Sequence, residues 1–191
     1  MKTLETLKSL GTEEALASKS FFEYLYATLA SWGMHRMGPG AKLVEFTDFV
    51  KTLQSQKEKI FDLEGLKLTH IKEEGLKSTM NKLWNILSNL KASSTETQLT
   101  AGSKALHHLL PDLMPPIDGE HTLRFVYGYK SSYESEEQRF KRIFPLLWKI
   151  GNREKSTILQ WIGKGFHTSE TKVIDNAIVG YVKTRMKKVD Y

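Results

Sequence analysis

The chain has 191 residues, of which 40% are hydrophobic, 26% charged and 10% aromatic, and its formal net charge is +6. This length is typical of one globular domain, or of two small lobes that share a core. The absence of cysteine excludes disulfides, zinc–thiolate sites, iron–sulfur clusters and thiol nucleophiles. No apolar run reaches the ~18 residues of a membrane span, and the N-terminal residues lack the apolar core of a secretory signal. We therefore expect a soluble, cytoplasmic protein.

The excess positive charge is concentrated in the last third of the chain. Residues 131–191 carry 12 basic and 7 acidic side chains, a net of +5, whereas residues 1–60 have a net of +1 and residues 61–130 a net of zero. A basic third attracts polyanions such as DNA, RNA or anionic lipid. A solvated basic surface is the plainer interpretation of so small an excess.

The first long apolar pattern predicts a helix in the N-terminal part of the chain. Over residues 22–32, apolar side chains recur at steps of three and four, which is the spacing of one helix face. Ser18 or Ser20 is placed to cap this helix, and Gly33 to end it. A loop is predicted over 35–40, whose sequence HRMGPG contains two glycines and a proline.

Two further helices are predicted before the middle of the chain. Apolar residues mark a helix over 46–53, with a polar tail after it, and a second strong stripe marks a helix over 76–90. Residues 92–98 (ASSTETQ) form the clearest loop, in which Ser93 and Glu96 have the spacing of a capping box.

The segment 101–118 (AGSKALHHLLPDLMPPID) is the densest candidate site. A short helix is predicted over 102–110 and ends at Pro111, after which three prolines in six residues make a rigid, extended connection. Asp118 then stands at the N-cap position of a helix through 121–125.

Two or more helices are predicted in the last third of the chain. Ser135 and Gln138 have the spacing of a second capping box, before a helix over 140–147. Further helices are expected over 158–162 and from Thr168 onward.

These patterns together predict an all-α fold of seven to nine helices, because no segment shows the two-residue alternation of a strand. The helices are expected to form one domain over 1–191. Two closely packed lobes are the alternative, with the site in 20–130 and the basic C-terminal part in 131–191. The residues expected in the core are Trp32, Leu83, Leu87, Phe144 and Ile178.

Lys104 and Asp118 are the candidate catalytic residues. In the predicted helix Lys104 lies in the first turn, where the helix dipole disfavours a cation and so favours the neutral amine that a nucleophile requires. The proline segment holds the carboxylate of Asp118, and the short helix and stiff return allow both side chains to reach one cleft. The plainer interpretation is a solvated lysine and an ordinary N-cap carboxylate.

The chain has no P-loop, GxGxxG, HExxH or GxSxG motif. His107 and His121 flank Asp118, but their spacing matches no known metal-binding pattern. We therefore expect no metal and no cofactor.

Three short segments resemble the helix-hairpin-helix DNA glycosylase superfamily. FFEYLYATLASWGMHRMG at 21–38 resembles its opening helix, GSKA at 102–105 resembles the segment with its lysine nucleophile, and PPIDGEHTLRF at 115–125 resembles the segment with its catalytic aspartate. The hairpin is degenerate, since TQLTAG stands in its place at 97–102. SKALHHLLPDLMPPID and LASWGMHRMG also resemble segments of a family of uncharacterised microbial proteins.

The resemblance implies a glycosylase-like fold over about 20–190 and removal of a flipped base from DNA. Asp118 would stabilise positive charge on the sugar, and Lys104 would displace the base through a Schiff-base intermediate. The residues implied to contact phosphate are Arg36, Lys42, Lys183, Arg185, Lys187 and Lys188. Those expected elsewhere in the cleft are Trp32, Ser103, His107 and Arg124.

Two functions stay open from the sequence. The first is a nucleic-acid-binding protein with DNA as its partner, enzymatic or not. The alternative is a non-enzymatic module of a defence or toxin–antitoxin kind, which would bind a protein that the sequence does not identify. Neither function involves a membrane.

Overall fold

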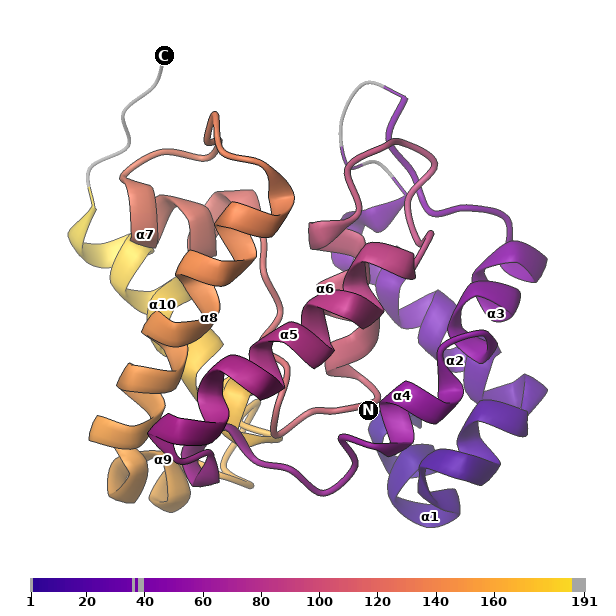
Figure 1. Ribbon diagram of the computed structural model, residues 1–191, viewed down its shortest axis with the longest axis horizontal. Coiled ribbons are helices and arrows are strands. Elements are labelled where there is room, and N and C mark those ends of the chain that lie inside the picture. The colour runs from indigo at the N-terminus through magenta and orange to yellow at the C-terminus, as the bar shows by residue number, and fades with distance from the viewer. Residues whose placement is uncertain (1, 36, 38–39, 187–191) are drawn as a thin grey trace.

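The computed structural model describes residues 2–35, 37 and 40–186, which fold into helices joined by loops (Figure 1). Within that part of the chain there is no β-strand, and extended backbone pairs only at an isolated bridge between Leu43 and Ser93. The predicted all-α fold is confirmed.

The described residues contain ten α-helices, seven of which have nine or more residues, in agreement with the predicted seven to nine. The helices are α1 (Lys2–Ala17), α2 (Lys19–Leu29), α3 (Phe46–Gln54), α4 (Lys57–Phe61), α5 (Glu73–Asn89), α6 (Leu99–His107), α7 (Arg124–Tyr127), α8 (Glu136–Arg153), α9 (Lys155–Trp161) and α10 (Glu170–Arg185). The shorter turns are η1 (Ala30–Met34) and η3 (Gly119–Leu123), which are π-helical, and η2 (Leu68–His70), which is 3-10. Over the described ranges, none of these helices has the length and apolar content that crossing a bilayer requires.

Two of the predicted helix starts carry the predicted caps. The Ser18 hydroxyl accepts a hydrogen bond of 3.3 Å from the backbone N–H of Phe21 at the start of α2. Ser135 and Gln138 form a reciprocal capping box at the start of α8. Each cap satisfies backbone donors that the first helical turn leaves without an intrahelical partner.

Helix α1 is the longest element that the sequence pattern did not indicate. Gly11 inside it has a φ of 77°, so the helix consists of two short pieces joined at a kink. Leu4, Leu7 and Leu16 are nevertheless buried, and the helix packs mainly against α2. Tertiary packing therefore holds this segment, in the absence of a strong apolar stripe.

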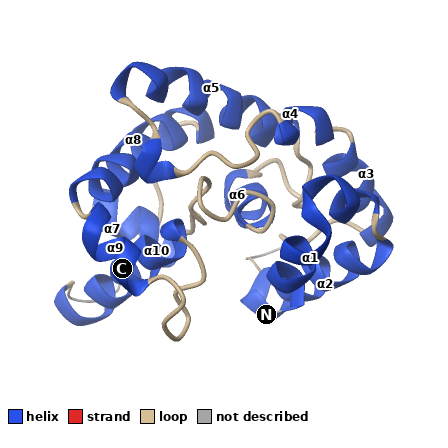
Figure 2. Ribbon diagram, turned by 90° about the horizontal axis from the view of Figure 1, so that it is seen from below, coloured by secondary structure: helices blue, strands red, loops and turns tan. Residues whose placement is uncertain are grey.

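The helices form an arc around α6. In Figure 1, α7, α8, α9 and α10 lie on one side and α1 to α4 on the other, with α5 and α6 between them. Helix α5 packs against both α6 and α8 and so links the two sides. Viewed from below, the arc opens on the side opposite α5, between α1 and α2 on one flank and α9 and α10 on the other (Figure 2).

One set of buried apolar side chains runs from α1 to α10. Leu83, Leu87, Phe144 and Ile178 belong to it, as predicted. Trp32 does not, because it is only half-buried and its ring lines two cavities on the open side of the arc. The division into one domain or two lobes stays a prediction.

Candidate functional site

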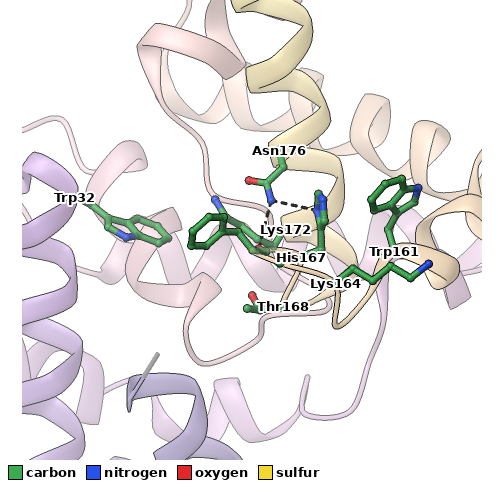
Figure 3. Close-up of a pocket in the computed structure, with 9 residues that line it drawn as sticks. Trp32, Trp161, Lys164, His167, Thr168, Lys172 and Asn176 are labelled. Carbon is green, nitrogen blue, oxygen red and sulfur yellow. Dashed lines mark hydrogen bonds between the residues drawn. The ribbon is translucent and has the colours of Figure 1, made fainter.

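Two adjoining cavities lie between the N-terminal helices and α10. The smaller one, here the polar cavity, has a volume of about 220 Å³ and is lined by Trp32, Lys104, Pro116, Asp118, His121, Lys172, Asp175 and Val179. The larger one, here the aromatic cavity, has a volume of about 920 Å³ and is lined by Trp32, Trp161, Lys164, Gly165, Phe166, His167, Thr168, Lys172 and Asn176 (Figure 3). Trp32 and Lys172 line both, so the two cavities adjoin and together make up the candidate site.

The structure brings Lys104 and Asp118 together in the polar cavity. The connection between them is held against α6 by two buried side chains. The Ser103 hydroxyl accepts a hydrogen bond of 3.0 Å from the backbone N–H of Ile117, and the His107 ring, through Nδ1, lies 2.9 Å from the Met114 carbonyl. This anchoring returns Asp118 to the side of the helix that carries Lys104.

Ser103 and His107 therefore position the site and do not line it. Both are buried, with 0% and 1% of their surface exposed. The expectation that they face the cleft is wrong, because their polar atoms are directed to the backbone of the returning segment, where unpaired groups would be costly. Of the four further cleft residues predicted, Trp32 lines the polar cavity.

Lys104 lies in the last turn of α6 and not in the first. The helix begins at Leu99 because the carboxylate of Glu136, from the first turn of α8, accepts hydrogen bonds of 2.9 Å from the backbone N–H groups of Gln98 and Leu99. A cap supplied from this distance in the sequence leaves no local signal. This position corrects the expectation that Lys104 lies in the first turn, where the helix dipole would disfavour a cation. The predicted capping box at Ser93 is also absent from the start of α6.

Asp118 caps η3, as predicted for this helix start. Its carboxylate accepts hydrogen bonds from the backbone N–H groups of His121 (2.8 Å) and Thr122 (3.3 Å). Burial acts to raise the pKa of Asp118, but the His121 hydrogen bond and the positive charge of Lys104 outweigh it, and the pKa lies below its ordinary value. Asp118 is therefore an ionised carboxylate at neutral pH.

A second carboxylate, which sequence reasoning missed, faces the same cavity. Asp175 on α10 forms an ion pair of 2.5 Å with Lys172, one helical turn before it. Burial raises the pKa of Asp175; Lys172 opposes this shift, and the nearby charge of Asp118 adds to it. Two neighbouring carboxyl groups whose pKa values are shifted in opposite directions are suited to separate roles, one ionised and one able to carry a proton. The one sign of this ion pair in the sequence is the i, i+3 spacing of Lys172 and Asp175. This spacing of opposite charges is too common in helices to identify a functional site.

The ring of Trp32 lies beside the rings of two buried histidines. Its ring centre lies 4.9 Å from that of His108 and 6.4 Å from that of His107. Burial lowers the pKa of His107 to about 4 and that of His108 to about 3, and the charge of Lys172 lowers both. Both rings are neutral at pH 7, so they support Trp32 without adding charge to the cavity.

The other basic residues predicted to contact phosphate lie away from the polar cavity, or outside the described ranges. Lys42 is exposed and pairs with Glu45 at 3.8 Å. Lys183 and Arg185 occupy the last turn of α10, which places Arg185 about 20 Å along the helix from Lys172 at 1.5 Å per residue. The three predicted contacts that fall outside the described residues are Arg36, Lys187 and Lys188.

Arg124 is buried near the start of α7 and does not line either cavity. Its guanidinium lies 3.8 Å from the carboxylate of Glu120. Its predicted place in the cleft is therefore wrong. Across the described ranges, no group of three or more His, Asp or Glu side chains is arranged to hold a metal ion.

Comparison with models of known protein families, with curated proteins and with solved structures gave no match for the chain. The assignment of a function therefore rests on the geometry of the polar and aromatic cavities.

Proposed function

We propose that the chain binds nucleic acid and cleaves the bond between base and sugar of an unpaired nucleotide in the polar cavity. The observation that carries this proposal is the convergence of Lys104 and Asp118 on one cavity, beside a second carboxylate, Asp175. A lysine amine and an ionised carboxylate are the two groups that a glycosidic displacement through a Schiff base requires. The resemblance of the same two segments to DNA glycosylases supports the same chemistry.

The roles follow from the charge states. Asp118, ionised and fixed by two backbone hydrogen bonds, stabilises the positive charge that develops on the sugar as the bond to the base breaks. Lys104 forms a bond from its nitrogen to the sugar carbon, and the base leaves with the electron pair of the broken bond. Asp175, a carboxylate paired with Lys172 whose pKa is raised by burial, is the group suited to take the proton that Lys104 loses and to pass it to the departing base.

Lys104 has to lose its proton before it can attack, and the Asp175 carboxylate in the same cavity is the acceptor. Closure of the cavity by a bound nucleotide removes water and weakens the preference for the charged amine. The proposal therefore requires that the lysine reacts in the complex and is unreactive in the free protein.

The test is borohydride trapping on duplex DNA that carries a damaged base or an abasic site. We expect a covalent adduct with the unmodified protein, no adduct with Lys104→Ala, and a strongly reduced adduct with Asp118→Asn. Lys149→Ala, which alters an exposed lysine on α8, is the matched control and retains the adduct. An adduct that persists in Lys104→Ala and disappears in Lys172→Ala moves the nucleophile to the other lysine of the cavity.

Base release is measured in parallel, since cleavage by water leaves no adduct. Neither adduct nor released base on any lesion would overturn the proposed chemistry. Absence of binding to any nucleic acid as well would leave the protein-interaction module as the function.

A further inference from the structure

We infer that the aromatic cavity binds the single-stranded part of a nucleic acid, with its bases stacked on Trp161 and Phe166 and a phosphate beside Lys164. This inference rests on the proposed function for the class of ligand. It adds a binding surface on the loop between α9 and α10, which has no part in the chemistry proposed for the polar cavity.

The first observation is the exposure of two large rings at this loop. Phe166 is 83% exposed and Trp161 is 48% exposed, and both line the cavity. Gly163 and Gly165 flank Lys164 with φ values of 84° and 58°, in a backbone conformation that glycine adopts without strain. The turn thus presents Lys164 and Phe166 to solvent next to the Trp161 ring. Contiguous exposed apolar side chains of this size mark interaction sites.

The second observation is that the loop is fixed in this form. The backbone N–H of Gly163 donates a hydrogen bond of 2.7 Å to the carbonyl of His167. The side-chain amide of Asn176, on α10, donates to the carbonyl of Phe166 (3.3 Å) and lies 3.2 Å from His167 Nδ1 (Figure 3). The Trp161 and His167 ring centres lie 5.4 Å apart. The loop backbone and the Trp161 ring are therefore held in place before a ligand binds, which reduces the entropy that binding loses.

The third observation is the charge of the lining. The ammonium nitrogen of Lys164 lies 5.5 Å from the centre of the Trp161 ring, and that of Lys172 lies 5.3 Å from the centre of the Trp32 ring. None of the nine lining residues is an aspartate or glutamate, but Lys172 is paired with Asp175 outside the lining, so Lys164 is the lysine that faces a ligand. Rings alone would accept an apolar side chain equally well, but the ammonium group of Lys164 beside the Trp161 ring favours an occupant that is both flat and anionic. A nucleotide strand has both properties at every step.

The fourth observation is that the two cavities adjoin. Figure 3 shows Trp32 and Trp161 at opposite sides of the aromatic cavity, with Lys172 and His167 between them. Because Trp32 and Lys172 also line the polar cavity, a strand in the aromatic cavity lies next to it. A volume of about 920 Å³ lies at the upper end of the ~300–1,000 Å³ range of ligand pockets. Stacking on both rings requires unpaired bases, so the strand bound here is single.

The experiment measures binding of a fluorescein-labelled oligothymidine of about twelve nucleotides, and of the corresponding duplex, by fluorescence anisotropy. We expect the single strand to bind more tightly. The double variant Trp161→Ala/Phe166→Ala should raise its Kd by about tenfold or more, since stacking on an aromatic ring is worth ~1–3 kcal/mol per base. Leu159→Ala, which removes a comparably exposed apolar side chain from α9 outside the cavity, is the matched control and leaves the Kd unchanged.

Two further variants separate a binding role from a structural one. Trp161→Phe/Phe166→Tyr keeps a ring at each position and should bind within about twofold of the unmodified protein, because stacking does not depend on the identity of the ring. Lys164→Ala should reduce the slope of log K against log salt by about 0.7, the value for one phosphate contact on a single strand. Circular dichroism and the thermal midpoint establish that each variant is folded.

The inference and the proposed function fail in different ways. A double variant that binds oligothymidine as tightly as the unmodified protein, or an unmodified protein that does not bind it, overturns the inference whatever the trapping experiment shows. Ring-dependent binding of the single strand without a borohydride adduct or base release supports the inference and removes the proposed chemistry.

Discussion

The ammonium nitrogen of Lys172 lies 5.3 Å from the centre of the Trp32 ring, at the boundary between the two cavities. Lys172 is also in the first turn of α10, where the helix dipole disfavours a cation. The carboxylate of Asp175, at 2.5 Å, and the face of Trp32 offset this cost. The sequence predicts Lys104 in the first turn of a helix, where the dipole disfavours a cation. In the structure, Lys172 occupies such a position.

The first prediction concerns the coupling of Lys172 and Asp175, whose side chains are only 18% and 10% exposed. Lys172→Met should destabilise the fold by about 1–3 kcal/mol, because it leaves the Asp175 carboxylate without its cation in a largely buried place. Asp175→Asn should cost a similar amount. The double variant Lys172→Met/Asp175→Asn should cost less than the sum, with a coupling free energy of about 1–2 kcal/mol. Urea unfolding of the four proteins measures the cycle.

The exposed pair Lys19 and Glu23 on α2, whose closest charged atoms are 3.6 Å apart, provides the comparison cycle. Exposed pairs of this kind couple by about 0.2–1 kcal/mol. A coupling for Lys172 and Asp175 no larger than that of Lys19 and Glu23 would show that the pair contributes nothing beyond an ordinary surface contact.

The second prediction concerns Glu136, whose carboxylate binds two backbone N–H groups at the start of α6. Glu136→Gln should lower the free energy of unfolding by about 1–3 kcal/mol, since one oxygen and the negative charge at the helix N-terminus are both lost. The neighbouring Glu137→Gln alters an exposed side chain that pairs with Lys141, and it should cost less than about 1 kcal/mol. Denaturant unfolding distinguishes the two; equal effects would contradict a capping role for Glu136.

The third prediction links stability to the geometry of the polar cavity. The buried Ser103 hydroxyl bonds to both backbone groups of Ile117, the N–H at 3.0 Å and the carbonyl at 3.3 Å. Ser103→Ala should cost about 1–3 kcal/mol, because these groups lose their partner in the interior. It should also reduce base release or adduct formation, because the segment that carries Asp118 is no longer tied to α6. Ser88→Ala, on the exposed part of α5, should change neither stability nor activity, and loss of activity there would indicate a non-specific effect.

The helices could largely be predicted from the sequence because their signals are local. Ser18 directly precedes α2, and the capping box of Ser135 and Gln138 lies at the start of α8. Both signals therefore lie within four residues of the helix start that they indicate. The start of α6 could not be predicted, because its cap comes from Glu136, 37 residues after Leu99. That single long-range contact moves Lys104 from the first turn to the last.

The pairing of Lys104 with Asp118 was accessible to sequence reasoning, because a short helix and a stiff return limit how far apart they can be. The remainder of the site was not. Lys172 and Asp175 reach the polar cavity because α10 packs against η3, and Trp161 lies in the predicted helix over 158–162, whose apolar stripe does not indicate a cavity. Helical periodicity identifies a face, but it does not distinguish a face that packs against another helix from one that lines a cavity.

The last prediction concerns the two histidines behind Trp32. Burial holds the pKa of His107 at about 4 and that of His108 at about 3, whereas the same groups titrate near 6.5 in the unfolded chain. Between pH 6.5 and about 4 the unfolded state therefore binds protons that the folded state does not, and the free energy of unfolding falls as the pH is lowered through this window. Above pH 6.5 this effect is absent.

As the pH falls from 6.5 to 4.5, proton uptake by the two histidines in the unfolded state should lower the free energy of unfolding by roughly 3–5 kcal/mol in total. Each fully titrating group contributes about 1.36 kcal/mol per pH unit. Guanidinium unfolding at several pH values measures the slope. In His108→Leu the slope should fall by about half, and at pH 7 this variant should lose little stability, because neither ring nitrogen of His108 has a hydrogen-bond partner to lose. His70→Asn, at an exposed histidine in η2, should leave the slope unchanged. An unaltered slope in His108→Leu would mean that His108 takes up its proton over the same pH range in the folded protein as in the unfolded chain, and below about pH 6.5 the Trp32 ring would then lie beside a charged imidazolium.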